Sequence, residues 1–148
     1  KASYPHKKNL EITLAFLGEK TEEEIKSIKN NLSEIKFNNF DITIKDIGSF
    51  SSSHSINNIW IGVESEKIGK LLSEICKSIN FELDKPFNPH ITLCRIKTQK
   101  NIKLIKEFIL KTKNVDLGSF KAESFVLKKS TLTKDGPIYS NIETFELN

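Results

Sequence analysis

Two near-copies of one tetrapeptide, 79 residues apart, constrain the fold of this chain more than any other feature. The first is Glu11-Ile12-Thr13-Leu14 and the second is His90-Ile91-Thr92-Leu93. Each copy closes a short apolar stretch, predicted to be a strand, that runs on into a helical pattern. In a strand the first and third residues of each copy project from one face while the second and fourth enter the core. The repeat therefore predicts two similar halves that face each other across one site.

The polar positions of the two copies indicate the chemistry. His90 and Glu11 are titratable, and each is followed two residues later by a hydroxyl donor, Thr92 or Thr13. Two titratable groups that flank two hydroxyl donors suit acid–base chemistry around a small anion.

The basic residues add a second signal. Of the 23 lysine and arginine residues, Arg95 is the single arginine. A chain so rich in lysine has kept arginine at one place, and a planar arginine fork is irreplaceable where an oxyanion is held bidentately. Arg95 lies five residues after His90, which favours a role as an oxyanion clamp. Taken without that motif, a lone arginine is better explained by chance or by a surface ion pair.

These residues resemble the two-histidine phosphoesterases, and specifically the RNA 2′,3′-cyclic phosphodiesterases that were first described as 2′-5′ RNA ligases. That family is defined by two His-x-Thr-x motifs, and the second is intact here and continues into Cys94-Arg95-Ile96. Further landmarks follow the family's order along essentially the whole chain: Asn9-Leu10, Ala15-Phe16-Leu17-Gly18-Glu19, Ile59-Trp60-Ile61-Gly62-Val63, Lys129-Ser130-Thr131-Leu132-Thr133 and Gly136-Pro137-Ile138-Tyr139. One His-x-Thr is a weak signal, but several landmarks in register make the resemblance specific.

Two departures from the family pattern are found, one in the first motif and one at the start of the chain. Glu11 stands where the family has a histidine, and His6 cannot replace it, because it lies five residues upstream with no threonine two positions on. Family members open with a strand and a helix ahead of this motif, whereas this chain begins at Lys1 and contains no methionine. We therefore expect the family's N-terminal strand and helix to be missing.

The resemblance implies an α+β fold in which residues 1–148 form a single bilobal phosphodiesterase domain, with duplicated antiparallel sheets and flanking helices around a central cleft. The hydrophobic pattern predicts the same class. Thr21 and Glu24 form a capping box, and apolar residues recur at helical spacing in three segments: Ile25, Ile28, Leu32 and Ile35, then Ile68, Leu71, Leu72, Ile75 and Ile79, then Ile102, Ile105, Phe108 and Ile109. Strands are predicted at residues 40–44, 59–63, 120–127 and 138–147, with Lys134-Asp135-Gly136 as a hairpin turn and residues 51–55 as an exposed loop.

The activity that the resemblance implies is metal-independent hydrolysis of RNA 2′,3′-cyclic phosphate ends to 2′-phosphates, with reversible 2′-5′ RNA ligation as a further expectation. In this assignment His90 is the general base, and the residue at position 11, here Glu11, is the general acid. Thr13 and Thr92 hydrogen-bond the phosphate, and Arg95 clamps it. No cofactor is implied.

Aromatic residues are further site candidates. Phe16 lies five residues beyond Glu11, and in the family the corresponding ring stacks on the terminal base, a contact worth roughly 1–3 kcal/mol per base. Core packing beside Leu14 is an equally open interpretation of Phe16. Trp60 and Tyr139 fit core or cleft-wall positions better than ligand-binding ones.

Glu11 decides how active such a site can be. An ordinary glutamate is almost wholly ionised at pH 7, so it is a poor proton donor, and its charge repels an anionic substrate. Three interpretations stay open: a weakened phosphodiesterase, a catalytically impaired RNA-end-binding protein of the same fold, or a substitution introduced into this chain. The retention of His90 beside Arg95 favours the phosphodiesterase.

Composition and charge bound the remaining classes. A net charge of +4 and a pI near 9.0 suit a polyanionic partner such as RNA, tRNA fragments included, although lysine-rich surfaces produce such a charge without any ligand. No apolar run approaches the ~20 residues that span a bilayer, so we expect a cytoplasmic protein. We also expect a monomer. Cys76 and Cys94 fit reduced core positions, and His6, His54 and His90 lack the short spacing of a metal site.

Overall fold

The computed structural model describes residues 1–5, 7–51, 55–134 and 136–148, and the chain divides into two compact units. The first unit comprises Lys1–Leu14, Ile42–Ser65 and Asn88–Phe120. The second unit comprises Ala15–Asp41, Glu66–Phe87 and Lys121–Asn148. Both units therefore draw on three separate parts of the sequence, and the two tetrapeptides fall in the same one.

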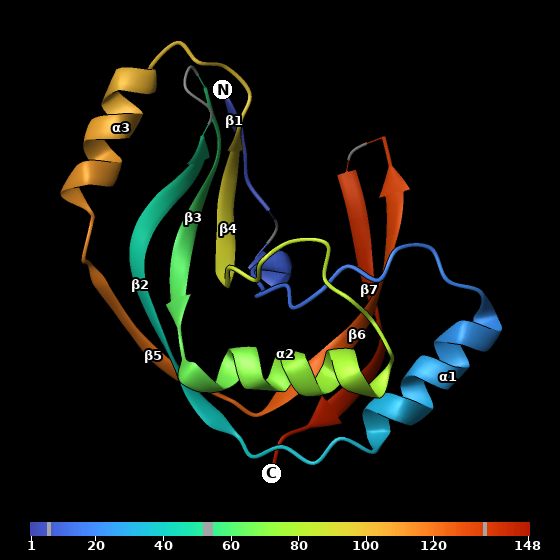
Figure 1. The fold of residues 1–148 in the computed structure, drawn as a ribbon. Helices are drawn as coiled ribbons and strands as arrows, with labels where there is room; N and C mark the ends of the chain where they lie inside the picture. The colour runs from blue at the N-terminus through green and yellow to red at the C-terminus, as the bar shows by residue number, and fades with distance from the viewer. Residues whose placement is uncertain (6, 52–54, 135) are drawn as a thin grey trace. The chain divides into compact units, whose positions relative to one another are not determined.

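The first unit is built on a five-stranded sheet with the strand order β1-β4-β3-β2-β5 (Figure 1). The pairs β1–β4, β4–β3 and β3–β2 are antiparallel. The strands are β1 (Ala2–Ser3), β2 (Phe40–Ser51), β3 (Ile56–Glu64), β4 (His90–Ile96) and β5 (Asp116–Ala122), and the helix of this unit is α3 (Ile102–Lys111). A short 3-10 turn, η1 (Lys7–Asn9), precedes the first tetrapeptide.

One face of this sheet is aliphatic. Residues that pair directly across antiparallel strands share a face, and neighbours along a strand alternate between faces. The register therefore gathers on one face, with Ser49 as a polar member, a set of apolar residues: Ile44, Ile47, Ile59, Ile61, Val63, Ile91 and Cys94. The opposite face has a more polar composition, which bears on the candidate site.

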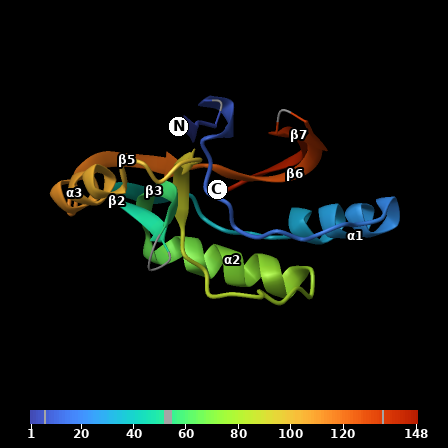
Figure 2. The same cartoon turned by 90° about the horizontal axis from the view of Figure 1, so that it is seen from above.

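The second unit pairs a β-hairpin with two helices. The hairpin is formed by β6 (Ser124–Thr133) and β7 (Gly136–Glu146), and the helices are α1 (Glu22–Ser33) and α2 (Glu66–Ser78). Figure 2 shows both helices on the same side of the hairpin. The buried residues of this unit are Ile28, Leu32, Phe40, Ile68, Leu71, Leu72, Ile75, Phe145 and Leu147. Most of the buried apolar side chains in the described part of the chain therefore belong to this unit.

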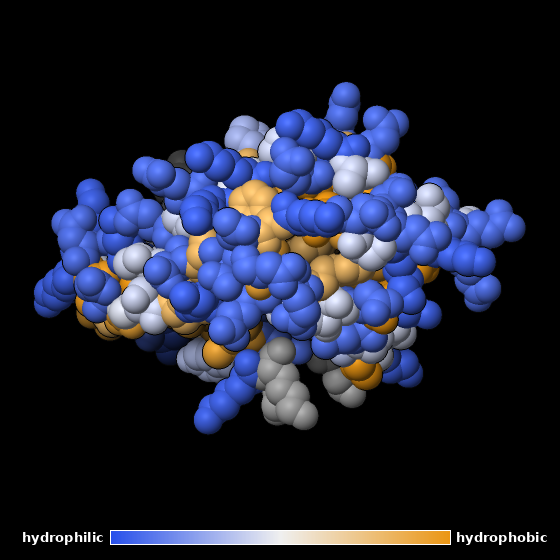
Figure 3. Space-filling view, turned by 90° about the horizontal axis from the view of Figure 1, so that it is seen from below, coloured by the Kyte–Doolittle hydropathy of each residue, from blue (hydrophilic) through white to orange (hydrophobic). Residues whose placement is uncertain are grey.

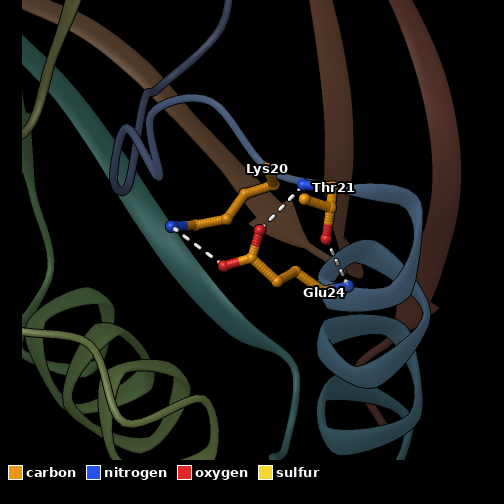
Figure 4. A network of polar contacts seen from close by, with 3 residues as sticks. All are labelled: Lys20, Thr21 and Glu24. Carbon is orange, nitrogen blue, oxygen red and sulfur yellow. Dashed lines mark hydrogen bonds and ion pairs between the residues drawn. The ribbon is translucent and has the colours of Figure 1, made fainter.

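The predicted capping box begins α1 (Figure 4). The Glu24 backbone N–H donates to Thr21 Oγ1 at 3.2 Å, and the Thr21 backbone N–H donates to Glu24 Oε2 at 2.8 Å. Lys20 Nζ lies 3.9 Å from Glu24 Oε1. The hydrogen bond from the Thr21 backbone, with help from its side chain and Lys20, lowers the pKa of Glu24. The first turn of α1 thereby gains partners for N–H groups that the helix itself leaves unpaired.

The structure confirms the three predicted helices and the α+β class, and it corrects some of the strands. Residues 11–14 form an isolated bridge at Ile12 instead of a strand. The second tetrapeptide opens β4 and does not close a strand. The stretch 120–127, predicted as one strand, is divided at Glu123 because β5 and β6 belong to different sheets. The two sheets have five and two strands, so they differ in size.

The predicted loops lie partly outside the described residues. Thr133 pairs with Gly136 at the end of the final hairpin, where the turn was expected, and Asp135 between them is not described. Likewise, only Ser51 and Ser55 of the predicted 51–55 loop are described. The hairpin itself is confirmed.

The surface has the mixed character that the composition predicts. Hydrophilic side chains cover most of the face shown in Figure 3, and hydrophobic side chains appear between them. In α3 no side chain is buried, and Leu104 is 64% exposed. Cys76 and Cys94 are free thiols, as expected, and burial raises the pKa of both. No helix in the described ranges is long and apolar enough to cross a membrane.

Candidate active site

The second tetrapeptide places its two polar residues on one face of the sheet. His90 pairs with Gly62 of β3, and Thr92 pairs with Trp60. Since Ile91 lies between them on the aliphatic face, His90 and Thr92 project together from the opposite face, as their spacing predicts. We call this opposite surface the site face. Its members from paired strands are Ser3, Thr43, Lys45, Gly48, Phe50, Asn58, Trp60, Gly62, Glu64, His90, Thr92 and Arg95.

The first tetrapeptide lies directly alongside the second. An antiparallel bridge joins Ile12 to Ile91. In an antiparallel bridge the flanking residues of the two chains also lie near each other, so the bridge brings Glu11 near Thr92 and Thr13 near His90. Both motifs therefore lie side by side in one unit. The sequence predicted their convergence, but from strands of two separate halves.

Arg95 reaches the site face because of a β-bulge. Regular alternation would put Arg95, three residues after Thr92, on the aliphatic face. However, Trp60 pairs with Thr92 while the adjacent Ile59 pairs with Cys94, so β4 holds one extra residue, Leu93. A bulge of this kind re-aims the side chains beyond it. Cys94 then falls on the aliphatic face and is buried, whereas Arg95 is exposed on the face that carries His90.

A hydrogen bond fixes the tautomer of His90. Nδ1 of His90 lies 2.7 Å from the backbone carbonyl oxygen of Asn88. A carbonyl can only accept, so Nδ1 carries the hydrogen and donates it, which leaves Nε2 of a neutral imidazole with a free lone pair. That nitrogen is suited to take a proton from a bound water. Sequence reasoning missed Asn88, since a backbone carbonyl leaves no signature in residue type.

Two aromatic rings surround His90. The centroid of Phe50 lies 4.9 Å from that of the imidazole in an edge arrangement, and the centroid of Trp60 lies 6.3 Å away. Phe50 and Trp60 also contact each other, with centroids 5.7 Å apart. Trp60 is half-buried on the site face. Phe50 was not singled out from the sequence, where it resembles any other apolar strand residue.

The other aromatic candidates lie in the second unit. Phe16 is 79% exposed, so the core-packing interpretation is wrong, and its ring is open to a stacking partner. Tyr139 of β7 is half-buried. Among the residues that the structure describes, no group of three or more histidine, cysteine, aspartate or glutamate side chains could hold a metal ion.

The charge at the site is mixed. Glu11 is half-buried and Thr13 is exposed. Arg95 supplies a cation at one end of the face, and Lys45 Nζ at the other end forms an ion pair with Glu64 Oε2. A phosphate centred between the two tetrapeptides would therefore find two hydroxyl donors, one guanidinium and one imidazole, together with one opposing carboxylate.

Comparison with known proteins gives a consistent result. A family model described as LigT-like phosphoesterase matches residues 1–60 and 61–139. A curated protein of Methanocaldococcus jannaschii, named RNA 2′,3′-cyclic phosphodiesterase, is 39% identical over 140 residues, which cover 93% of this chain and 80% of that protein. One of the same name from Archaeoglobus fulgidus is 37% identical over 142 residues, with the same shares covered. A solved structure from Thermus thermophilus matches 99% of this chain and 82% of its own, with a TM-score of 0.81 and 25% identity.

Proposed function

This chain belongs to the LigT-like phosphoesterase family, and from that premise we propose that it hydrolyses 2′,3′-cyclic phosphate ends of RNA to 2′-phosphates. The substrate follows from the name that the curated relatives share. The observation that carries the proposal is the bridge between Ile12 and Ile91, because it brings the polar residues of both tetrapeptides together on one face.

The reaction can be assigned to the residues of this face. Nε2 of His90 takes a proton from a water as the water oxygen bonds to phosphorus. The bond from phosphorus to O3′ breaks in line, and a protonated Glu11 gives its proton to the departing O3′. The hydroxyls of Thr13 and Thr92 and the guanidinium of Arg95 donate hydrogen bonds to the non-bridging oxygens, where negative charge grows. Exposed Phe16 is the proposed stacking surface for the terminal base.

A second candidate function follows from Glu11. Glu11 stands where the family has a histidine, so the general-acid role falls here to a carboxyl group beside an anionic substrate. A chain with this defect could still bind RNA ends through Arg95 and the two threonines. The two functions differ in turnover and not in affinity, so one experiment separates them.

We also propose a class of substrates, an oligomeric state and a location for this protein. The expected substrates are RNA ends such as those of tRNA fragments, and the protein would act as a monomer in the cytoplasm. If the 5′-hydroxyl of another RNA takes the place of the water, the same groups could open the cyclic phosphate with O3′ as the leaving group and form a 2′-5′ linkage, and this transesterification is reversible. Water at high concentration favours hydrolysis. No divalent ion takes part, since the imidazole, guanidinium and hydroxyl groups supply the proton transfer and the charge stabilisation.

The test is to incubate the protein with a short RNA that ends in a 2′,3′-cyclic phosphate, with and without EDTA. We expect ring opening at equal rates in both samples, measured by separation of the cyclic and opened ends. Binding to the same RNA is measured in parallel. Binding without ring opening, even at stoichiometric protein, would support the RNA-end binder, and loss of turnover in EDTA would contradict the metal-free mechanism.

A further inference from the structure

Two glycines lie on the site face in the middle of their strands. Gly48 of β2 pairs with Trp60, and Gly62 of β3 pairs with His90. Glycine in a strand interior weakens the strand and often marks a place where another group approaches closely. Neither glycine is among the described residues with positive φ, so backbone conformation does not require them. The atoms that lie close to each glycine have to be the reason.

The indole of Trp60 occupies the space above Gly48. A Cβ added to Gly48 would lie 2.3 Å from Cη2, 2.4 Å from Cζ2 and 2.8 Å from Cζ3 of Trp60. No real side chain tolerates such distances. At Gly62 an added Cβ would lie 2.6 Å from the backbone carbonyl oxygen of Lys45 and 3.6 Å from Cζ3 of Trp60, so the close approach of the β2 backbone requires this glycine. The absence of a side chain at Gly48 is therefore what lets the indole lie over β2.

The Trp60 indole above Gly48 belongs to the aromatic cluster around His90. Trp60 contacts Phe50, and Phe50 contacts the imidazole edge-on at 4.9 Å between centroids. The hydrogen bond from Nδ1 to the Asn88 carbonyl oxygen fixes one edge of the imidazole. Rotation of the ring about the axis of this hydrogen bond is limited only by the side chains packed against the ring. Phe50 and Trp60 supply that packing.

We propose that Gly48 leaves the space that the Trp60 indole occupies. Trp60 and Phe50 are then positioning residues, which hold the His90 ring with Nε2 aimed at the attacking water. The inference rests on the proposed function for its catalytic part, while the orientation of His90 is a property of the free protein. The alternative is that the aromatic cluster only adds apolar burial to this end of the sheet. A burial role predicts lost stability with unchanged catalysis per folded molecule.

Trp60 carries one feature beyond packing. Its indole N–H is buried, and no described residue accepts a hydrogen bond from it. An unpaired buried donor typically costs about 1–3 kcal/mol, so Trp60 is a poor choice for a position that needs only apolar volume. Selection for a large flat ring above Gly48 accounts for the choice better.

The first variant is Gly48→Ala, with Gly69→Ala as its control. The added methyl must push the indole off β2, and because misplacement of a catalytic group by about 1 Å can cost about 100-fold in rate, we expect kcat to fall by roughly 10–100-fold with little change in KM. Gly69 lies exposed in α2 with nothing within 4 Å of an added Cβ, so Gly69→Ala should leave kcat unchanged. Unchanged kcat in folded Gly48→Ala would overturn the proposal.

A double-mutant cycle shows whether Gly48 acts through Trp60. Trp60→Ala should lower kcat by a similar factor, and adding Gly48→Ala to Trp60→Ala should change kcat little, because the ring that would clash is gone. The thermal unfolding midpoint of each variant is measured beside kcat. If the reductions in kcat of the two single variants multiply in the double variant, Gly48 acts independently of Trp60, and the proposal would fail.

Imidazole nitrogen NMR gives a readout that needs no substrate. The chain has three histidines, and the signals of His90 are assigned by their loss in His90→Ala. We expect neutral His90 in the parent to be the Nδ1–H tautomer with one set of signals, and both Gly48→Ala and Trp60→Ala to shift or broaden them. Unmoved signals would overturn the positioning role even in an active enzyme. Moved signals in a parent that opens no cyclic phosphate would support the positioning role and count against the proposed function alone.

Discussion

The variant His90→Ala should open RNA 2′,3′-cyclic phosphates about 10²–10⁴-fold more slowly than the parent, because a positioned general base typically contributes that factor. Affinity for the RNA should stay close to that of the parent. The Nδ1–H of His90 donates a hydrogen bond to the Asn88 carbonyl oxygen, so Nε2 is the nitrogen that can act on water. Nε2 is not required to hold the phosphate. Single-turnover rates and RNA affinity, measured on the same preparation, check both halves of this result.

Arginine variants supply the matched contrast. Arg95→Lys keeps the charge but loses the planar fork, so we expect it to be nearly as harmful as Arg95→Ala, with weaker RNA binding in both. His90→Ala would then lower only the rate of ring opening, whereas Arg95→Lys would lower both the rate and the affinity for RNA. If Arg95→Lys behaves like the parent, Arg95 acts only as a point charge. Equal losses of affinity in His90→Ala and Arg95→Lys would contradict the separate roles.

The second large effect is expected at Glu11, where the substitution Glu11→His should raise the rate by about tenfold or more. It rebuilds the first motif of the family ahead of Ile12 and Thr13. An imidazolium is a proton donor matched to neutral pH, and the change also removes a negative charge from the surroundings of the phosphate. The bridge at Ile12 should be unaffected, because the exchanged side chain lies on the other face of the chain. The measurement is the rate of ring opening at pH 7 with saturating RNA.

The variant Glu11→Gln separates the two causes. It removes the charge of Glu11 with almost no change in size, but an amide is no practical proton donor. We expect the rates to rank with Glu11→His first, the parent second and Glu11→Gln last. If Glu11→Gln is as fast as Glu11→His, charge repulsion and not proton supply limits the parent. If Glu11→His stays at background while it binds RNA normally, the RNA-end binder becomes the better account of this chain.

Much of the local structure follows from the sequence. Alternation correctly placed His90 and Thr92 on one face, and the capping box at Thr21 correctly placed the start of α1. Spacing of apolar residues predicted α2, whose buried Ile68, Leu71, Leu72 and Ile75 form its inner face. These features depend on residues close together in the chain, so the sequence contains the information needed to predict them.

The features that complete the site depend on pairing between distant strands. No sequence pattern near Arg95 predicts the β-bulge that Leu93 forms in β4. Without that bulge the single arginine would lie on the face opposite to His90. The partnership of Ile12 with Ile91 is likewise a tertiary contact, and it replaced the predicted strand at residues 11–14. Gly48 did carry a usable signal, since a glycine inside a strand marks a close approach, but its partner Trp60 could be identified only from the register.

The chemical identity of the opened RNA end shows which bond to phosphorus the protein breaks. If His90 delivers water in line with the bond from phosphorus to O3′, and Glu11 protonates that oxygen, the phosphate must stay on O2′. Phosphorus-31 NMR of the products from a 2′,3′-cyclic phosphate RNA, with the two authentic monophosphates as standards, distinguishes the outcomes. The account predicts a single 2′-phosphate product. A 3′-phosphate, or a mixture of both, would contradict the assignment of roles on the site face.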